Sequence, residues 1–183
     1  MNPDTVRPVF ESNLSTLRAQ SPELDTCIRR LSELGDVVLG GGAVRDWALG
    51  REPRDYDFVL EAGRERVEPL LAPYAPGRNS FGGWKVKLDG REIDLWSVSE
   101  TWALNQPGAP PARIENLPRA FLYSVDTLFY SVNTGRITEN GFFDSFRDGE
   151  IRFISPYVRI PFRLPVVRGL RLARRYGLRL SPE

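Results

Sequence analysis

The chain of 183 residues contains no histidine, a single cysteine and a single methionine. The absence of histidine excludes histidine metal ligands, histidine general bases and the usual serine or cysteine triads. Any chemistry must therefore use carboxylates, lysine, arginine, hydroxyl groups or a metal ion. The lone cysteine, Cys27, cannot form an internal disulfide. It lies in an apolar stripe with helical spacing, so we interpret it as a core residue and not as a nucleophile.

Long apolar segments are also missing, because no run approaches the roughly 20 residues that span a bilayer. The N-terminus shows no basic region followed by an apolar run, so a cytoplasmic protein with no membrane partner is the simplest expectation. A formal charge of +1 gives no overall signal for nucleic acid, whereas 41% apolar residues are enough to fill a core. The length fits one domain, or one domain with a helical appendage.

The sequence is organised around a glycine-rich turn. An apolar run ends at Leu39, Gly40 to Gly42 follow, and residues 44–49 show brief helical spacing that Gly50 ends. This order of strand, turn and helix favours a phosphate site, because a phosphate approaches backbone N–H groups closely only where no Cβ intervenes. Glycine clusters also form ordinary tight turns, so the turn alone does not decide the function.

The next segment, Asp55-Tyr56-Asp57, reads as part of a strand. Side chains two residues apart on a strand share a face and lie ~7 Å apart, so Asp55 and Asp57 project together. Two carboxylates on one face repel each other unless a cation lies between them, and hard oxygen ligands suit Mg²⁺. The pattern therefore indicates a magnesium site, with two solvated aspartates on an edge strand as the alternative.

Together these segments resemble the head domain of tRNA nucleotidyltransferases and bacterial poly(A) polymerases, in the polymerase β superfamily. The resemblance rests on Gly40-Gly-Gly-Ala-Val-Arg-Asp46, Leu49-Gly-Arg51 and Asp55-Tyr-Asp57, and it extends from about Val37 to the end of the chain. It implies an α/β nucleotidyltransferase fold: a small twisted mixed sheet, helices mainly on one side, and acids on the open face. We expect a head domain over 1–163 and a basic neck-like helix over 164–183.

A hairpin is predicted over 81–96, because residues alternate on both sides of the Asp89-Gly90 turn. In the resembling family the strand after such a hairpin supplies a third acid beside the paired aspartates, and Asp94 matches that position. Lys85 shares a face with Lys87 and could reach triphosphate oxygens. Solubilising charges on an exposed strand are the alternative interpretation of these lysines.

The sequence departs from the family after a proline-rich stretch, 101–118, that is predicted to be a loop. Ala120-Phe-Leu122 stands where the family has a charged Arg-Arg-Asp triplet, and Arg119 is a candidate substitute. The next segment, Tyr123-Ser-Val-Asp-Thr-Leu128, matches the part of the family motif that follows the triplet, with Asp126 in place of an asparagine.

Arg45 either contacts the triphosphate or pairs with Asp46. Separate partners for Arg45 and Asp46 are favoured, since adjacent helical residues point apart. The predicted nucleotide-binding residues are Gly41, Gly42, Arg45, Lys85, Arg119 and Asp126.

The C-terminal segment is basic, with eight arginines and no acid from Arg152 to Arg179. Pro165 near its start and Gly177 just past its end suit a helix. On that helix Arg168, Arg171 and Arg175 form a basic stripe. Such a stripe could bind RNA phosphates, or it could dock a partner protein or a further domain. The alternative is that the stripe is simply a solvated face.

These features predict a Mg²⁺-dependent nucleotidyltransferase that moves a nucleoside monophosphate from an NTP, with ATP expected, to an acceptor hydroxyl and releases pyrophosphate. One ion held by Asp55 and Asp57 would bind the triphosphate, and a second, shared with Asp94, would activate the acceptor. The resemblance favours an RNA 3′ end as the acceptor. The alternatives are a transferase acting on a protein or small-molecule hydroxyl and, given the lost triplet, a non-catalytic nucleotide-binding or partner-binding module.

Overall fold

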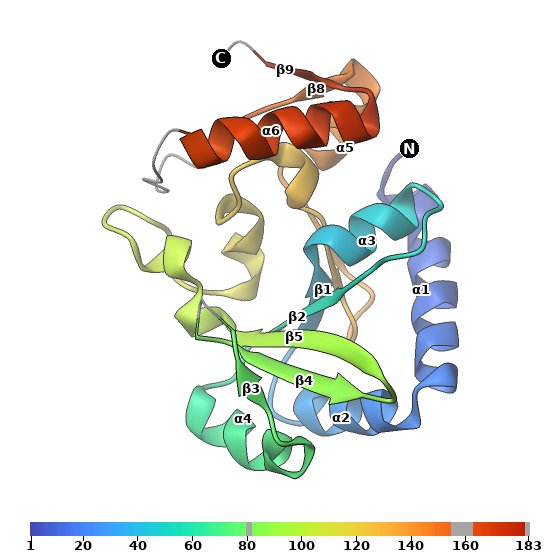
Figure 1. Cartoon of the computed structure of the whole chain (residues 1–183), viewed down its shortest axis with the longest axis vertical. Coiled ribbons are helices and arrows are strands. Elements are labelled where there is room, and N and C mark those ends of the chain that lie inside the picture. The colour runs from blue at the N-terminus through green and yellow to red at the C-terminus, as the bar shows by residue number, and fades with distance from the viewer. Residues whose placement is uncertain (80–81, 155–162, 182–183) are drawn as a thin grey trace.

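The computed structural model describes residues 1–79, 82–154 and 163–181, and for 163 and 164 only the backbone. Seven strands form one mixed sheet in the order β3-β4-β5-β2-β1-β6-β7 (Figure 1). β2 pairs with β5 in parallel, whereas all other neighbours in this sheet are antiparallel. The strands are β1 Val37–Gly40, β2 Tyr56–Leu60, β3 Gly77–Arg78, β4 Trp84–Leu88, β5 Arg91–Ser97, β6 Phe129–Ser131 and β7 Ile137–Thr138.

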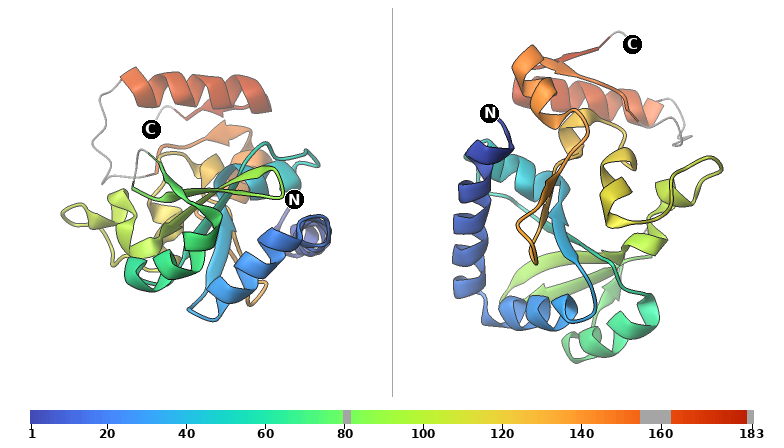
Figure 2. Two further views of the ribbon diagram at one scale, coloured as in Figure 1. Left: turned by 60° about the horizontal axis from the view of Figure 1, so that its bottom comes forward. Right: turned by 180° about the vertical axis from the view of Figure 1, so that it is seen from behind.

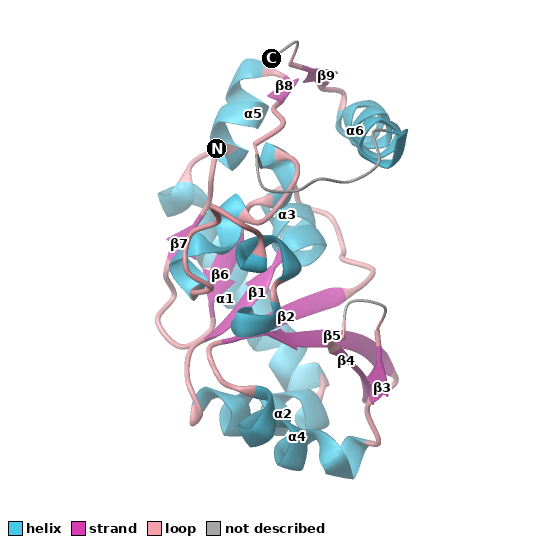
Figure 3. Ribbon diagram, turned by 90° about the vertical axis from the view of Figure 1, so that its left-hand side faces the viewer, coloured by secondary structure: helices cyan, strands magenta, loops and turns pink. Residues whose placement is uncertain are grey.

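Helices cover one face of this sheet. They are α1 (Pro3–Gln20), α2 (Pro22–Ser32) and α4 (Arg64–Leu71), which a 3₁₀ turn over Ala72–Tyr74 follows. Figure 3 shows α2 and α4 side by side against the strands. The apolar stripe of α2 is buried, including Cys27, whose burial raises the pKa of its thiol to about 12. The predicted core role of Cys27 is therefore confirmed.

The opposite face carries no long helix within the described ranges. Short 3₁₀ turns cross it at Val98–Glu100, Trp102–Asn105 and Ile114–Arg119. They place Leu104 and Leu117 over Val38, Val59 and Phe129 of the sheet. Figure 2 shows this segment and α1 on opposite sides of the molecule. In the described part of the chain the long helices thus lie mainly on one side of the sheet, as expected for this α/β fold.

A smaller C-terminal layer packs beside the sheet. A 3₁₀ turn (Ser124–Asp126), α5 (Phe142–Asp148), β8 (Glu150–Ile151), α6 (Arg163–Tyr176) and β9 (Arg179–Leu180) form it, and β8 pairs in parallel with β9. Leu172 of α6 is buried against Tyr123, Val125 and Ile151. The helix expected within 164–183 ends before Gly177, as that glycine predicted, so it does not fill the whole of that range. It ends at Tyr176 because Gly177 adopts a left-handed conformation with φ of +67°, and a strand follows.

In the described ranges, none of the helices is both long and apolar enough for a transmembrane span.

Candidate active site

The open face carries a row of functional side chains across neighbouring strands. The parallel register of β2 and β5 places Asp57 directly beside Asp94. On the far side of Asp94, β4 contributes Lys85, and on the far side of Asp57, β1 contributes Gly40. Residues paired in this way point to the same face of a sheet. The structure therefore brings Asp57 and Asp94 together, although they are far apart in the sequence.

Asp57 is the electrostatic centre of this row. Burial and, after it, the negative charges of Asp94 and Asp55 together raise the pKa of its carboxyl to about 6, against the lowering effect of Arg45 and Arg168. Asp55, just before β2, is more exposed and bonds through Oδ2 to Arg54 Nη2 at 2.6 Å. The charges of Asp55 and Asp94 thus both act on Asp57.

The carboxylates of Asp57 and Asp94 can be judged as metal ligands by their arrangement and by their chemical type. Within the described part of the chain, no group of three or more His, Cys, Asp or Glu side chains is arranged to hold an ion. The donors are nevertheless of the right kind, because Asp57 and Asp94 offer carboxylate oxygens from adjacent strands and the charge on Asp57 is only partly compensated. These residues therefore fit a hard divalent cation such as Mg²⁺.

The glycine turn begins a helix beside Asp57. α3 (Gly41–Ala48) starts directly after β1, with Gly40 at its N-cap and no side-chain cap. Gly41 has a φ of +61°, and a Cβ placed there would lie 3.5 Å from Asp57 Oδ2. A Cβ at Gly40 would collide with the Phe129 ring. The predicted strand, turn and helix are confirmed, and they bring the first turn of α3 to the carboxylates.

A chain of ion pairs connects α3 to the C-terminal helix. Buried Arg45 pairs with Asp126, whose other oxygen accepts a hydrogen bond from Arg168 Nη2 at 2.7 Å. Asp46 instead accepts from Arg175 Nη2 at 3.1 Å and from Tyr176 Oη at 3.2 Å. Arg45 and Asp46 have separate main partners, as the sequence favoured, although Arg45 Nε also lies 3.8 Å from Asp46 Oδ1.

A cleft of about 520 Å³ opens over this site. Of the predicted site residues, Asp57, Asp94 and Asp126 line it. Arg119 is exposed at the end of its 3₁₀ turn and is not part of the lining, and Lys85 bonds to Glu92 through Nζ at 3.3 Å beside the cleft. The full lining is Asp57, Asn79, Gly83, Asp94, Trp96, Glu100, Thr101, Trp102, Ala103, Ala120, Phe121, Leu122, Asp126 and Arg168.

Sequence reasoning missed two contributors to this cleft. Arg168 was identified only as part of a basic stripe, yet its guanidinium reaches the lining from α6. Trp102 lies in the stretch that the sequence predicts to be a loop, yet it lines the same cleft. The arginine stripe was the available signal for the former, and an isolated tryptophan gave none for the latter.

Comparison with known proteins agrees with this geometry. Residues 37–98, from β1 to the start of the turn after β5, match the family model described as the poly(A) polymerase head domain. The matched head-domain segment contains the glycine turn and all three predicted carboxylates.

The curated proteins that this chain resembles are longer. Poly(A) polymerase I of Escherichia coli O6:H1 is 28% identical over 175 residues, covering 84% of this chain and 37% of that enzyme. The chain therefore spans little more than a third of the length of this curated relative.

Solved structures support the fold. A CCA-adding enzyme in complex with ATP has a TM-score of 0.65 at 20% identity, over 92% of this chain and 43% of that chain. A tRNA nucleotidyltransferase complexed with a primer tRNA and an incoming ATP analogue has a TM-score of 0.62 at 24% identity, over 80% of this chain and 44% of that one. The predicted α/β nucleotidyltransferase fold is confirmed.

Proposed function

We propose that the chain is the catalytic part of a nucleotidyltransferase that transfers a nucleoside monophosphate from ATP to the 3′ hydroxyl of an RNA. The observation that carries this proposal is the register of β2 and β5, which sets Asp57 beside Asp94 next to the glycine turn. The relatives add support, since they include a poly(A) polymerase and a tRNA nucleotidyltransferase solved with a primer tRNA and an ATP analogue.

The residues of the head domain have distinct roles in this proposal. Asp55, Asp57 and Asp94 would hold divalent metal at the open face, and the N–H groups of Gly41 and Gly42 would bind phosphate oxygens. Two Mg²⁺ ions, when bound, would neutralise the triphosphate and lower the pKa of the acceptor hydroxyl. The hydroxyl oxygen forms a bond to the α-phosphorus, the bond to the pyrophosphate oxygen breaks, and the hydroxyl proton leaves to solvent.

Cationic side chains complete the site. Arg45 pairs with buried Asp126 and holds it in place, and Arg168 lines the cleft. Lys85 and Arg119, which lie outside the lining, are proposed to reach the phosphates only at the cleft rim.

The test is incorporation of labelled ATP into short RNAs with Mg²⁺. Asp57→Asn and Asp94→Asn keep the size of each side chain and remove its charge. Because the metal contributes several kcal/mol to the transition state, each variant should lose activity by more than about 100-fold. Asp144→Asn is the matched control, since Asp144 is a partly exposed carboxylate on α5. Activity that persists in both Asp57→Asn and Asp94→Asn would refute the mechanism.

A second candidate is a nucleotide-binding module without catalysis. It is favoured by one observation: Ala120, Phe121 and Leu122, which replace the charged triplet of the resembling family, form an apolar part of the cleft lining. This candidate predicts that the wild-type protein binds ATP but releases no pyrophosphate with any RNA. Measuring ATP binding and pyrophosphate release on the same sample separates the two functions.

A further inference from the structure

The cleft has an apolar wall that the proposed phosphate chemistry does not use. This apolar wall consists of Trp102, Ala103, Ala120, Phe121 and Leu122. Trp102 is the most unusual member, because 48% of its surface is exposed. An exposed tryptophan inside a cleft leaves a large apolar face without a partner in the described part of the chain, which is typical of a ligand-binding surface.

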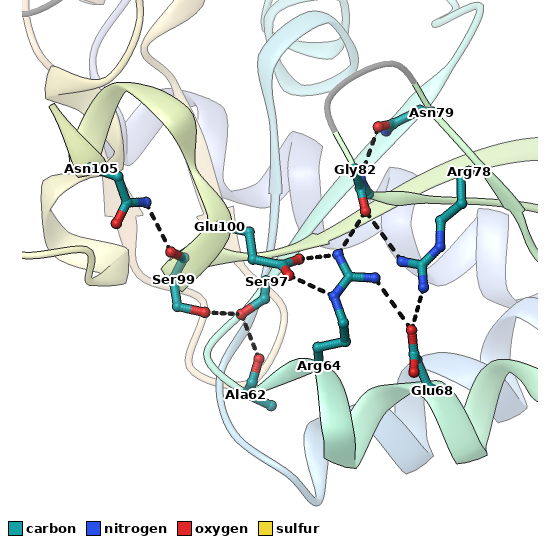
Figure 4. A network of polar contacts seen from close by, with 11 residues as sticks. Ala62, Arg64, Glu68, Arg78, Asn79, Gly82, Ser97, Ser99, Glu100 and Asn105 are labelled. Carbon is teal, nitrogen blue, oxygen red and sulfur yellow. Dashed lines mark hydrogen bonds and ion pairs between the residues drawn. The ribbon is translucent and has the colours of Figure 1, made fainter.

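Hydrogen bonds hold the segment around Trp102 in place (Figure 4). Before it, Ser97 Oγ donates to the Ala62 carbonyl at 2.6 Å, and Arg64 binds both carboxylate oxygens of Glu100 at 2.6 and 2.7 Å. After it, Asn105 Nδ2 donates to the carbonyl oxygens of Ser99 at 2.9 Å and Thr101 at 3.0 Å. The ring is therefore exposed on an anchored segment, so a ligand that contacts it need not first order the backbone.

The polar groups next to Trp102 are already engaged. Glu100 is bound by Arg64, and the Thr101 hydroxyl accepts a hydrogen bond from Trp96 Nε1 at 3.3 Å. Near Trp102 the cleft therefore presents mainly the flat face of the aromatic ring. Glu100 and Thr101 are already hydrogen-bonded within the chain and are less suited to bond with the edge of a base.

We propose that Trp102 is a stacking platform for the base of the nucleotide whose triphosphate lies at Asp57 and Asp94. This inference rests on the proposed function for the position of the triphosphate. A nucleotide combines a polyanion with a flat aromatic group, and the cleft combines a charged row and Arg168 with an apolar wall. Stacking tolerates every base, so we expect weak discrimination, with the larger purines bound more tightly than the pyrimidines.

The experiment compares binding of ATP with binding of inorganic tripolyphosphate, each with Mg²⁺, by calorimetry. Tripolyphosphate carries the charge of ATP but has no base. Trp102→Ala should bind ATP about ten-fold more weakly, because base stacking on an aromatic side chain is of that size, and should bind tripolyphosphate as the wild type does. Trp102→Phe keeps an aromatic face and should retain most of the ATP affinity.

The control is Phe153→Ala, because Phe153 has the same 48% exposure but lies outside the cleft lining. It should change neither affinity. Equal ATP affinity in Trp102→Ala and the wild type would overturn the inference, and so would an equal loss for both ligands. Selective loss of ATP binding without RNA extension by the wild type would support the stacking site and reject the proposed function, so the two failures are distinguishable.

Discussion

Asp57 carries a charge that the folded chain alone does not fully stabilise. Its carboxyl has a pKa of about 6, whereas the usual value is 3.8. Below about pH 4 the folded and unfolded states are both protonated at this position. Between about pH 4 and 6 the folded state keeps a proton that the unfolded state has lost. The free energy of unfolding therefore falls as pH rises through this window, and the loss is complete above it.

We expect Asp57→Asn to remove this pH dependence. At pH 7 the variant should be more stable than the wild type by up to about 3 kcal/mol, and near pH 4 the difference should vanish. Urea unfolding from pH 4 to 7, with a chelator to exclude metal, measures this difference. Asp144→Asn is the control, because the Asp144 side chain is 47% exposed and lies outside the cleft lining. A difference independent of pH would contradict the assignment.

Single residues were predictable to the extent that their partners lie nearby in the sequence. The spacing of Asp55 and Asp57 indicates one face directly, and Asp94 was placed by resemblance to a family hairpin. Asp126 and Arg168 pair although they lie 42 positions apart in the sequence, and no local sequence pattern predicts this pairing. Arg119 was chosen as a substitute for the missing charges because it is close in sequence, whereas the arginine that reaches the cleft comes from α6.

At the scale of elements, the junction of β1 and α3 depends on close packing. Gly40 lies between Asp57 on β2 and Phe129 on β6, and it is buried with the strand. A side chain there must displace the Phe129 ring from the small core formed with Val38 and Val59.

We expect Gly40→Ala to destabilise the protein by roughly 2–3 kcal/mol, the size typical of overpacking a core. Gly50→Ala is the matched control. Gly50 has a φ of +66° but nothing within 4 Å of its Cβ position, so that substitution should cost only about 1 kcal/mol from backbone strain. Urea unfolding at pH 7 compares the two variants. Equal losses would show that backbone conformation, and not the Phe129 contact, requires glycine at position 40.

Elements with a strong repeat were predictable, and irregular ones were not. The apolar stripe of α2 and the alternation around Asp89-Gly90 gave a helix and a hairpin, and both turn residues have the positive φ that this turn type requires, at +48° and +80°. The segment 98–119 has many prolines and no period, so its three 3₁₀ turns could not be recognised. Yet these turns cover part of the sheet and carry Trp102 into the cleft.

At the scale of the whole molecule, α6 packs beside the candidate site. Its arginine stripe turns partly inward, because Arg168 and Arg175 pair with Asp126 and Asp46. Leu172 anchors the same helix in a buried cluster. The two arginine side chains remain 56% and 54% exposed, so they hold the helix in place and still face solvent. The position of α6 thus couples the basic segment to the predicted nucleotide site.

Because α6 places Arg168 at the cleft, we expect Arg168 to contribute to binding of the triphosphate. Arg168→Ala should weaken binding of tripolyphosphate with Mg²⁺ by about ten-fold, since a charge-assisted hydrogen bond is worth about 1.5–3 kcal/mol and the site is open to solvent. The fold should survive, because Asp126 keeps its buried pair with Arg45. Arg171→Ala, on the same helix but outside the cleft lining, should bind like the wild type. Arg168→Lys, which keeps the charge, should recover part of the affinity. If Arg168→Ala and Arg171→Ala weaken binding equally, the effect comes from the overall charge of α6, and Arg168 has no specific place at the site.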